Sequence, residues 1–266
     1  LLMSLTYIYN MNILITNDDG LTSNGIIAAR NSVEDLGQTT LVAPLTQQSG
    51  VGHAITLMKP LRAIKTELSD KTYGYAVTGT PTDCVILAVK SIMDKKPDLI
   101  ISGMNIGENL SRSITTSGTL GATFEAASFG IPAIAVSLQV NREDLKFRTG
   151  VNFIDYSHAE SIVNKLAKKV IKHGMPEGVD ILNLNIPANP DSDEIIQSNF
   201  ADRMFSTDVE KRIDPYGHPY YWIVGDLIDD GIEGTDVHTL HILNQPAVTP
   251  ISIDMDAQVN ISKWLD

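Results

Sequence analysis

The stretch NILITNDDG (residues 12–20) places a short run of aliphatic and β-branched residues directly before two adjacent carboxylates and a glycine. Such an apolar run is typical of a buried β-strand. Two carboxylates within about 4–6 Å of each other repel, so the pKa of one should rise unless a positive charge is nearby. The motif contains no Lys or Arg. A divalent cation would supply the missing charge, so this stretch favours a strand that ends at a metal site.

Asp18 and Asp19 also have a simpler interpretation. Asp-Gly is a common turn dipeptide, and an aspartate here could cap the helix that follows. The motif alone does not separate the two interpretations. Its position at the end of the first strand, together with polar loops after later strands, favours the metal site.

Outward from this stretch, residues 11 to 138 alternate β-branched runs with segments of helical periodicity, the pattern of a parallel sheet covered by helices. A first helix is expected to begin with Asn24 as its cap and to end at Gly37, and a second to begin at Pro81. A third is expected over 117–130. The expected strands are 12–16, 39–43, 73–79, 97–103 and 131–138.

The pattern changes beyond residue 140. An amphipathic helix with a lysine-rich outer face is expected over 158–174, and one more strand over 181–187. Later, short alternating segments such as YYWIVGD (220–226), set among Pro and Gly, indicate hairpins rather than strand–helix–strand units. The predicted division is an upstream extension (1–10), an α/β core (11–187) and a C-terminal elaboration of hairpin and tail (188–266).

The charge balance limits the partners. The chain has 20 Lys plus Arg against 32 Asp plus Glu, a net charge of −12. A positive electrostatic field that would attract nucleic acid or an anionic membrane is therefore not expected, and neither is predicted as a partner. Any phosphate-bearing ligand would have to be held locally, by a cation or by backbone amides.

Cysteine content and hydropathy point to a cytoplasmic protein. The single Cys84 excludes a disulfide framework within the chain and favours a reducing compartment. No run of 18 apolar residues occurs, so a membrane-spanning helix is not expected. The opening LLMSLTYIYN lacks the basic start and cleavage site of a signal peptide, and Met11 would be a natural initiator after it.

Polar loops follow several of the expected strands. In an open parallel sheet, ligands bind outside the carboxyl ends of the strands, so these loops should meet in one crevice. Ser49 follows the second strand, and Asn105 follows the strand at 97–103. Carboxylates, a serine hydroxyl and an asparagine carbonyl are hard oxygen donors that suit Mg²⁺, Mn²⁺ or Ca²⁺. Each residue alone is more typical of a turn.

Ser117, Gly118 and Thr119 open a helix and favour a phosphate site. The free amides and the positive end of a helix dipole attract a phosphate, and glycine allows a close approach. The simpler alternative is that Ser or Thr merely caps the helix. His53, within a glycine-rich loop, is interpreted as a positioned or solvated side chain rather than an acid–base group.

With these loops aligned, the chain resembles the SurE family of stationary-phase survival proteins, which are metal-dependent nucleotidases. The matching segments are NILITNDDG (12–20), VAP with QQSGVGHAIT (42–56), VTGTPTDCV (77–85), PDLIISGMNIGENL (97–110) and SGTLGATFEAASFGIPAIAVSL (117–138). They follow the family order through most of residues 11–138. The resemblance implies a Rossmann-like α/β fold, a three-layer parallel sheet with helices on both faces, and a C-terminal β-hairpin used for oligomerisation.

The resemblance also implies a reaction. The family hydrolyses nucleoside 5′- and 3′-monophosphates to nucleoside and phosphate, with short polyphosphate as a further substrate, so a phosphoric monoester hydrolase is expected. It implies one divalent cation per subunit, Mg²⁺ or Mn²⁺. The implied cation ligands are Asp18, Asp19, Ser49 and Asn105. The residues expected to position the phosphoryl group are Asn105, Ser117, Gly118 and Thr119. A homodimer or homotetramer through residues 188–266 is also implied.

Two features depart from the family pattern. Thr116 stands where the family usually has a tyrosine just before SGT, so a contact near the phosphate is expected to differ. The C-terminal EGTDVHTLHILNQPAVTPIS (233–252) keeps the family's GTD and TPIS but is looser between them. The subunit contact therefore follows less directly from the resemblance than the metal site does.

The expected mechanism is metal-assisted phosphoryl transfer to water, with Asp18 and Asp19 as the catalytic residues. Either aspartate could orient or deprotonate the attacking water, and Asp19 could instead be a covalent nucleophile. A haloacid dehalogenase type of phosphatase is disfavoured because its DxD spacing is absent. The remaining alternative is a non-catalytic nucleotide- or phosphate-binding sensor on the same fold.

Overall fold

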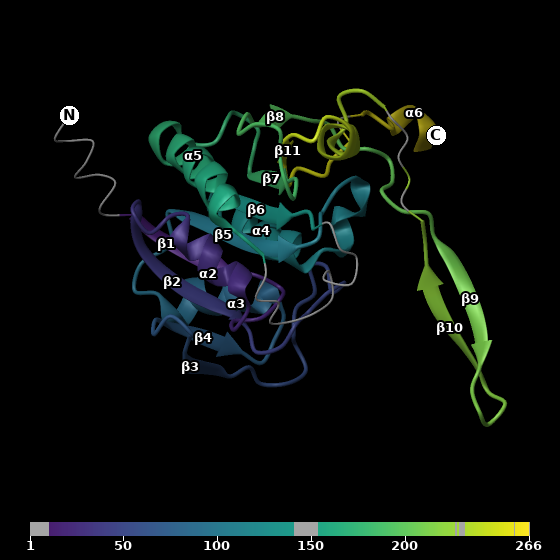
Figure 1. The fold of residues 1–266 in the computed structure, drawn as a ribbon, viewed down its shortest axis with the longest axis horizontal. Helices are drawn as coiled ribbons and strands as arrows, with labels where there is room; N and C mark the ends of the chain where they lie inside the picture. The colour runs from purple at the N-terminus through teal and green to yellow at the C-terminus, as the bar shows by residue number, and fades with distance from the viewer. Residues whose placement is uncertain (1–10, 141–153, 227, 229–231, 258, 266) are drawn as a thin grey trace.

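The computed structural model describes residues 11–140, 154–226, 228, 232–257 and 259–265 (Figure 1). Within them the main sheet has nine strands in the order β3-β4-β2-β1-β5-β6-β7-β11-β8, and β9 pairs with β10 in a separate hairpin. The strands are β1 (Met11–Thr16), β2 (Gly37–Pro44), β3 (Ala63–Glu67), β4 (Tyr73–Val77), β5 (Leu99–Ile106), β6 (Ala133–Leu138), β7 (Ile181–Ile186), β8 (Ile196–Gln197), β9 (Asp208–Ile213), β10 (Pro219–Val224) and β11 (Ala247–Ile251).

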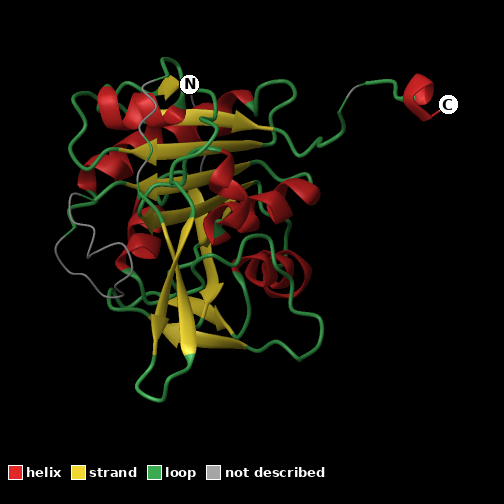
Figure 2. Cartoon of the chain, turned by 90° about the vertical axis from the view of Figure 1, so that its right-hand side faces the viewer, coloured by secondary structure: helices red, strands yellow, loops and turns green. Residues whose placement is uncertain are grey.

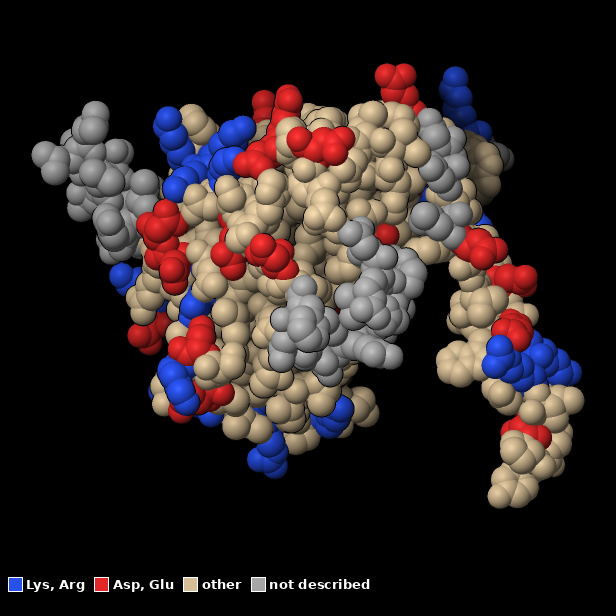
Figure 3. Space-filling view, in the orientation of Figure 1, with Lys and Arg blue, Asp and Glu red and all other residues tan. Residues whose placement is uncertain are grey.

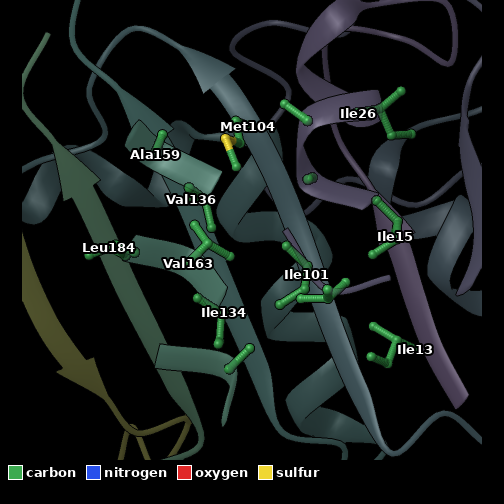
Figure 4. Close-up of a cluster of buried hydrophobic side chains, with 14 of the residues drawn as sticks. Ile13, Ile15, Ile26, Ile101, Met104, Ile134, Val136, Ala159, Val163 and Leu184 are labelled. Atoms are coloured by element: carbon green, nitrogen blue, oxygen red, sulfur yellow. The ribbon is translucent and has the colours of Figure 1, made fainter. Parts of the chain in front are cut away.

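Helices cover both faces of this sheet. The helices are α2 (Asn24–Asn31), α3 (Pro81–Leu87), α4 (Gly118–Ser128), α5 (Ser157–His173) and α6 (Ser262–Leu265), with shorter turns η1 (Ala88–Ile92), η2 (Arg112–Thr116) and η4 (His238–Ile242). Ile13 and Ile15 of β1 pack in one core with α2 and α5, whereas Leu14 packs in a second core with α3 and α4. Figure 4 shows the first core, where Ile26 of α2 and Val163 of α5 lie over the strands. The predicted α/β fold with helices on both faces is confirmed.

β1 lies at the centre of the sheet because it is apolar on both faces. Ile13, Leu14 and Ile15 are fully buried, and β1 pairs in parallel with β2 on one side and β5 on the other. Near-continuous aliphatic runs are typical of parallel strands that are covered twice. The carboxyl ends of β1, β2 and β5 therefore lie side by side at one edge.

The first helix is shorter than the sequence predicted. Ser23, in an extended conformation, is the N-cap, and Asn24 is already the first helical residue. The helix ends at Asn31, and Gly37 is the first residue of β2 rather than a helix stop. A Cβ at position 37 would lie 2.3 Å from the Met11 carbonyl oxygen, so glycine is required by the contact with β1. The capping prediction for Asn24 and the stop at Gly37 were wrong.

Two later elements also sharpen the prediction. Pro81 does open α3, with Thr80 and Asp83 forming a reciprocal capping box. β5 runs to Ile106, three residues beyond the predicted end at Gly103, and its register against β6 shifts between Ser102 and Asn105. Asn105 is thus part of an irregular strand end rather than of a free loop.

The chain after residue 187 contributes strands to the main sheet as well as a hairpin. β11 pairs antiparallel with β7, and β8 pairs in parallel with β11. The predicted hairpin at 220–226 is confirmed, because β10 pairs antiparallel with β9. The hairpin stands apart from the body in Figures 1 and 3, and α6 lies at the end of an extended tail in Figure 2. The division at residue 187 stays a prediction.

None of the helices in the described part of the chain is long and apolar enough to cross a membrane.

Candidate active site

The NDDG motif forms a turn whose shape is fixed by Asn17. This fully buried side chain donates from Nδ2 to Ser23 Oγ at 2.7 Å and to the Gly20 carbonyl oxygen at 3.2 Å, and its Oδ1 accepts from the Gly20 amide at 3.1 Å. Gly20 has φ 98°, which favours glycine. Because Ser23 is the N-cap of α2, the helix-capping alternative for Asp18 and Asp19 is wrong.

Asp18 faces the start of α4. It is 5% exposed, and Thr119 Oγ1 donates to its Oδ1 at 2.6 Å. Its carbonyl oxygen accepts from the Gln48 amide at 2.7 Å, which brings in the loop after β2. A Cβ on Gly118 would lie 2.8 Å from Asp18 Cβ, so the helix can begin this close only with glycine there. Asp18 thus joins three segments of the chain.

Asp19 connects two other segments. Gln47 Nε2 donates to its Oδ1 at 3.2 Å, and the backbone amide of Ile106 lies 3.4 Å from its Oδ2. Burial, followed by the charge of Asp18, raises the pKa of Asp19 to about 7. Burial also raises the pKa of Asp18, against the opposing hydrogen bond from Thr119. The protein thus holds two carboxylates whose ionisation is unfavourable without added positive charge, as the sequence predicted.

The predicted loops do converge on one cavity of about 670 Å³, which we call the carboxyl-edge cavity. Asp18, Ser49, Asn105 and Ser117 all line it. Asp19 lies beside it through Ile106, which is also a lining residue. The other described residues that line it are Gly50, Gly107, Glu108, Asn109, Thr116, Met204, Phe205, Ser206, Thr207, Ile223, Val224 and Gly225.

Asn105 is oriented by its own turn. Its Nδ2 donates to the Gly107 carbonyl oxygen at 2.7 Å, and Gly107 has φ 108°. Because the nitrogen of the Asn105 side-chain amide is bonded inside the turn, the oxygen of that amide is the potential ligand atom. A cation would bind this oxygen.

The start of α4 is compatible with both interpretations of the SGT motif, as a helix cap and as a phosphate site. Ser117 is the N-cap, and its Oγ accepts from the Leu120 amide at 3.2 Å, so the capping alternative is observed. Ser117 also lines the cavity. Thr119, by contrast, is fully buried with its hydroxyl on Asp18, so its side chain is used inside the protein.

The donor set of the site fits a hard divalent cation. It consists of carboxylate, hydroxyl and amide oxygens, and the described lining residues of the cavity include no Lys or Arg. Nowhere in the described part of the chain do three or more His, Cys, Asp or Glu side chains cluster to hold a metal. A cation here would therefore need Ser49 and Asn105 beside the two aspartates.

Two parts of the site lie outside the site residues predicted from the sequence. One wall, residues 204–207 and 223–225, comes from the base of the β9–β10 hairpin in the C-terminal elaboration. The second part is a hydrogen-bond network that supports Asn109.

The Asn109 network did have a signal. Asn183 and Asn185 of β7 are fully buried, and their Nδ2 atoms donate to the Asn109 carbonyl oxygen at 2.9 and 3.0 Å. Asn109 Nδ2 donates in turn to Ser137 Oγ at 2.8 Å. Asparagines at alternate positions of an apolar strand are unusual, and they could have been recognised as a support for the loop after β5.

The fold and the cavity together define a Rossmann-like α/β protein with an oxygen-rich site at the carboxyl edge of its sheet. The model of the family described as Survival protein SurE matches residues 13–207. The chain belongs to the SurE family, as its sequence motifs predicted.

Individual relatives agree over nearly the whole length. A protein named 5′-nucleotidase SurE from Methanobrevibacter smithii is 50% identical over 257 residues, which cover 96% of this chain and 100% of that protein. Its namesake from Methanothermobacter thermautotrophicus is 56% identical over 217 residues, 81% of this chain and 83% of that one. The crystal structure of the SurE protein from Aquifex aeolicus is similar with a TM-score of 0.77 at 35% identity, covering 96% of this chain and 98% of that one.

Proposed function

We propose that the protein is a metal-dependent nucleotidase that hydrolyses nucleoside 5′- and 3′-monophosphates to nucleoside and phosphate, with short polyphosphate as an additional substrate. The observation that carries the proposal is the single cavity in which Asp18, Ser49, Asn105 and Ser117 meet. These side chains offer oxygen ligands for a cation and donors for a phosphate in one place. The relatives named 5′-nucleotidase SurE support the same activity.

The cation ligands in this proposal are Asp18, Asp19, Ser49 and Asn105, for one Mg²⁺ or Mn²⁺ per subunit. A divalent cation, when bound, supplies positive charge to the phosphoryl oxygens and to a water molecule. Ser117 and the amides at the start of α4 bind the phosphoryl group, because the helix dipole and the free N–H groups favour an anion there. Gly118 keeps this helix start within reach of Asp18.

The structure favours different roles for the two aspartates. Asp18 lines the cavity, so we assign to it the orientation and deprotonation of the attacking water. Asp19 has both carboxylate oxygens bonded inside the protein, to Gln47 and Ile106, so we assign it to cation binding. In place of the direct phosphate contact expected for Thr119, we propose that its hydroxyl holds the Asp18 carboxylate.

The C-terminal region is proposed to join subunits into a homodimer or homotetramer. Tyr216 and Ile223 of the hairpin and Trp264 of the tail are among its most exposed large side chains, between 82% and 86% exposed. Apolar groups gathered on projecting segments favour contact with another chain. Light scattering of the full chain measures the assembly. A cytoplasmic location is part of the same proposal, and the single, buried Cys84 supports it.

The proposal is tested by phosphate release from AMP and 3′-AMP. We expect release with Mg²⁺ or Mn²⁺, loss of release in EDTA, and recovery when the metal is restored. A sensor would bind AMP in the same buffer without releasing phosphate. Absence of metal-dependent release from every monophosphate and from short polyphosphate would refute the enzyme.

Changing Ser117 to Ala is expected to raise KM for AMP about fivefold with a smaller change in kcat, since one hydrogen bond to the phosphate is worth about 1 kcal/mol. Loss of the cap should also lower Tm by a few degrees, because an N-cap contributes about 1 kcal/mol. Steady-state kinetics and thermal unfolding measure the two effects.

Thr80→Ala is the matched control for Ser117→Ala. Thr80 caps α3 by accepting from the Asp83 amide at 3.1 Å, and it does not line the carboxyl-edge cavity. Because Thr80 Oγ1 also donates to the Ala54 carbonyl oxygen at 2.6 Å, Thr80→Ala should lower Tm by at least as much, without changing KM. If Ser117→Ala, like Thr80→Ala, lowers Tm and leaves KM unchanged, Ser117 is a cap and not a phosphate ligand.

A further inference from the structure

A histidine–carboxylate pair lies beside the site without lining its cavity. His53 Nε2 is 2.9 Å from Glu125 Oε2. The Glu125 side chain, in the interior of α4, is 11% exposed, whereas that of His53 is 40% exposed. The ring of His53 also lies near that of Phe124, with centroids 6.0 Å apart. A carboxylate in this position is costly unless it is paired, so His53 is a structural partner rather than a merely solvated side chain.

The pair joins two of the segments that line the cavity. His53 belongs to the loop between β2 and β3, four residues after Ser49. Glu125 belongs to α4, whose first turn contains Gly118 and is capped by Ser117. The position of Ser49 relative to the helix start therefore depends on how this loop is fixed to α4.

Several contacts hold the loop against the first turns of α4. The Gly52 amide donates to the Thr116 carbonyl oxygen at 2.9 Å. A Cβ on Gly121 would lie 2.3 Å from the Gly52 carbonyl oxygen, so the loop lies directly on the helix. Upstream, the Gln48 amide donates to the Asp18 carbonyl oxygen. Ser49 sits between these two anchored amides.

The stretch that carries Ser49 contains two glycines, which favour flexibility. Gly50 and Gly52 both have positive φ, 73° and 57°, and glycines lose more conformational freedom on ordering than other residues. Among the described residues, no atom lies within 4 Å of the position that a Cβ on Gly50 would take, so no contact on that side holds the loop. His53 is the first long side chain after the glycines that reaches the helix, and its bond to Glu125 adds a side-chain contact next to the backbone contact of Gly52.

We propose that the His53–Glu125 pair is a positioning device that holds the Ser49 loop on α4 and thereby sets the geometry of the cation and phosphate site. The proposal rests on the nucleotidase function proposed above. Neither residue lines the cavity, so both act through Ser49 and not on the substrate. Groups that orient metal ligands in this way typically alter metal affinity about 10- to 100-fold when removed.

The first test follows the loop without metal or nucleotide. In His53→Ala, hydrogen exchange of the Gln48 and Gly52 amides should become about tenfold faster, because these amides report on whether the loop stays anchored. The amides in the middle of β1 should keep their protection. Unchanged exchange at both positions would overturn the proposal, whatever the enzyme turns out to hydrolyse.

The second test separates positioning from simple compensation of a buried charge. His53→Ala leaves Glu125 without this partner and should lower Tm. The double variant His53→Ala/Glu125→Gln removes that charge and should recover most of the Tm. We nevertheless expect it to bind Mn²⁺ alone about tenfold more weakly by calorimetry and to keep the fast exchange of Gly52. Recovery of both Mn²⁺ affinity and amide protection would show that His53 only compensates the charge of Glu125, and would refute positioning.

His158→Ala is the matched control. His158 Nε2 lies 2.8 Å from Asp193 Oδ1, nearly the same distance as in the His53 pair, but on α5 and with both side chains more than a third exposed. Its loss should change neither Mn²⁺ affinity nor the exchange of Gln48 and Gly52. If it changed both as much as His53→Ala does, the effects would be general and the proposal would fail.

Discussion

Changing Asp18 to Asn is expected to lower kcat/KM for AMP about a thousandfold while the fold stays intact. Asp18 is the aspartate that lines the carboxyl-edge cavity, and its carboxylate is held in place by Thr119. Removing its charge weakens cation binding and removes the proposed base, at a cost of several kcal/mol in the transition state. About 4 kcal/mol corresponds to a factor of about 10³. Phosphate release at saturating Mn²⁺ measures the loss.

The same variant has an opposite effect on the stability of the metal-free protein. The pKa of folded Asp19 is about 7, well above its value in an unfolded chain, with burial as the main cause and the charge of Asp18 as the second. The folded state therefore binds the proton more tightly, and the free energy of unfolding falls as pH rises from about 4 to about 7. Asp18→Asn removes the repelling charge, so at pH 8 its metal-free Tm should equal or exceed that of the unmodified protein. Added Mn²⁺ should raise Tm mainly in the latter.

Asp98→Asn serves as the control for Asp18→Asn. Asp98 is exposed at the amino end of β5, where its Oδ2 accepts from the Asn12 amide at 2.8 Å. It lies at the opposite edge of the sheet from the site, so kcat/KM should not change. Full activity in Asp18→Asn would exclude Asp18 from the reaction.

The central strands could be predicted because burial on both faces leaves a direct record in the sequence. β1, β5 and β6 are aliphatic runs that can be recognised as strands from their own residues. The helices between successive strands predict that these strands run parallel. β3 left no such record. Its sequence AIKTE is mostly exposed at the end of the sheet, so the side chains carry little information about strand pairing.

β11 was missed for a different physical reason. It contains Pro250, which has no amide to donate and argues against a strand inside a sheet. In the structure, Pro250 lies opposite Leu182 of β7, while β8 pairs only with Ala247 and Val248. β8 has ended before the proline is reached, so one side of β11 needs no hydrogen bond there. Only the tertiary arrangement reveals this.

The candidate site was predictable to the level of loops but not of atoms. The rule that ligands bind at the carboxyl ends of parallel strands grouped Asp18, Ser49 and Asn105 correctly in one cavity. It could not give the direction of Thr119, whose hydroxyl is turned to Asp18 by the close approach of the helix at Gly118. Residue types indicate a site's chemistry, whereas the orientation of each side chain depends on packing between segments far apart in sequence.

Asp236 shows how a single buried side chain can hold such segments together. It is fully buried, its Oδ2 accepts from the Ser111 amide at 2.7 Å, and its Oδ1 accepts from the amides of Ala201 and Val237 at 2.9 Å each. Burial raises the pKa of its carboxyl group, against the lowering effect of these amides. Ser111 precedes the turn that leads to Ser117, and Ala201 precedes the cavity wall at residues 204–207.

Asp236→Ala is therefore expected to lower the free energy of unfolding by about 4 kcal/mol, because it leaves three amide groups without their acceptor in the protein interior. For a chain of this size we expect Tm to fall by roughly 10 °C, measured by thermal unfolding.

Asp214→Ala is the matched control. Asp214 also accepts from two backbone amides, those of Tyr216 and His218 at 2.8 Å, but in the exposed hairpin turn. Water can replace it there, so its loss should cost about 1 kcal/mol or less. If the two variants unfold at the same temperature, Asp236 is not the anchor that joins the start of η2 to the wall of the cavity.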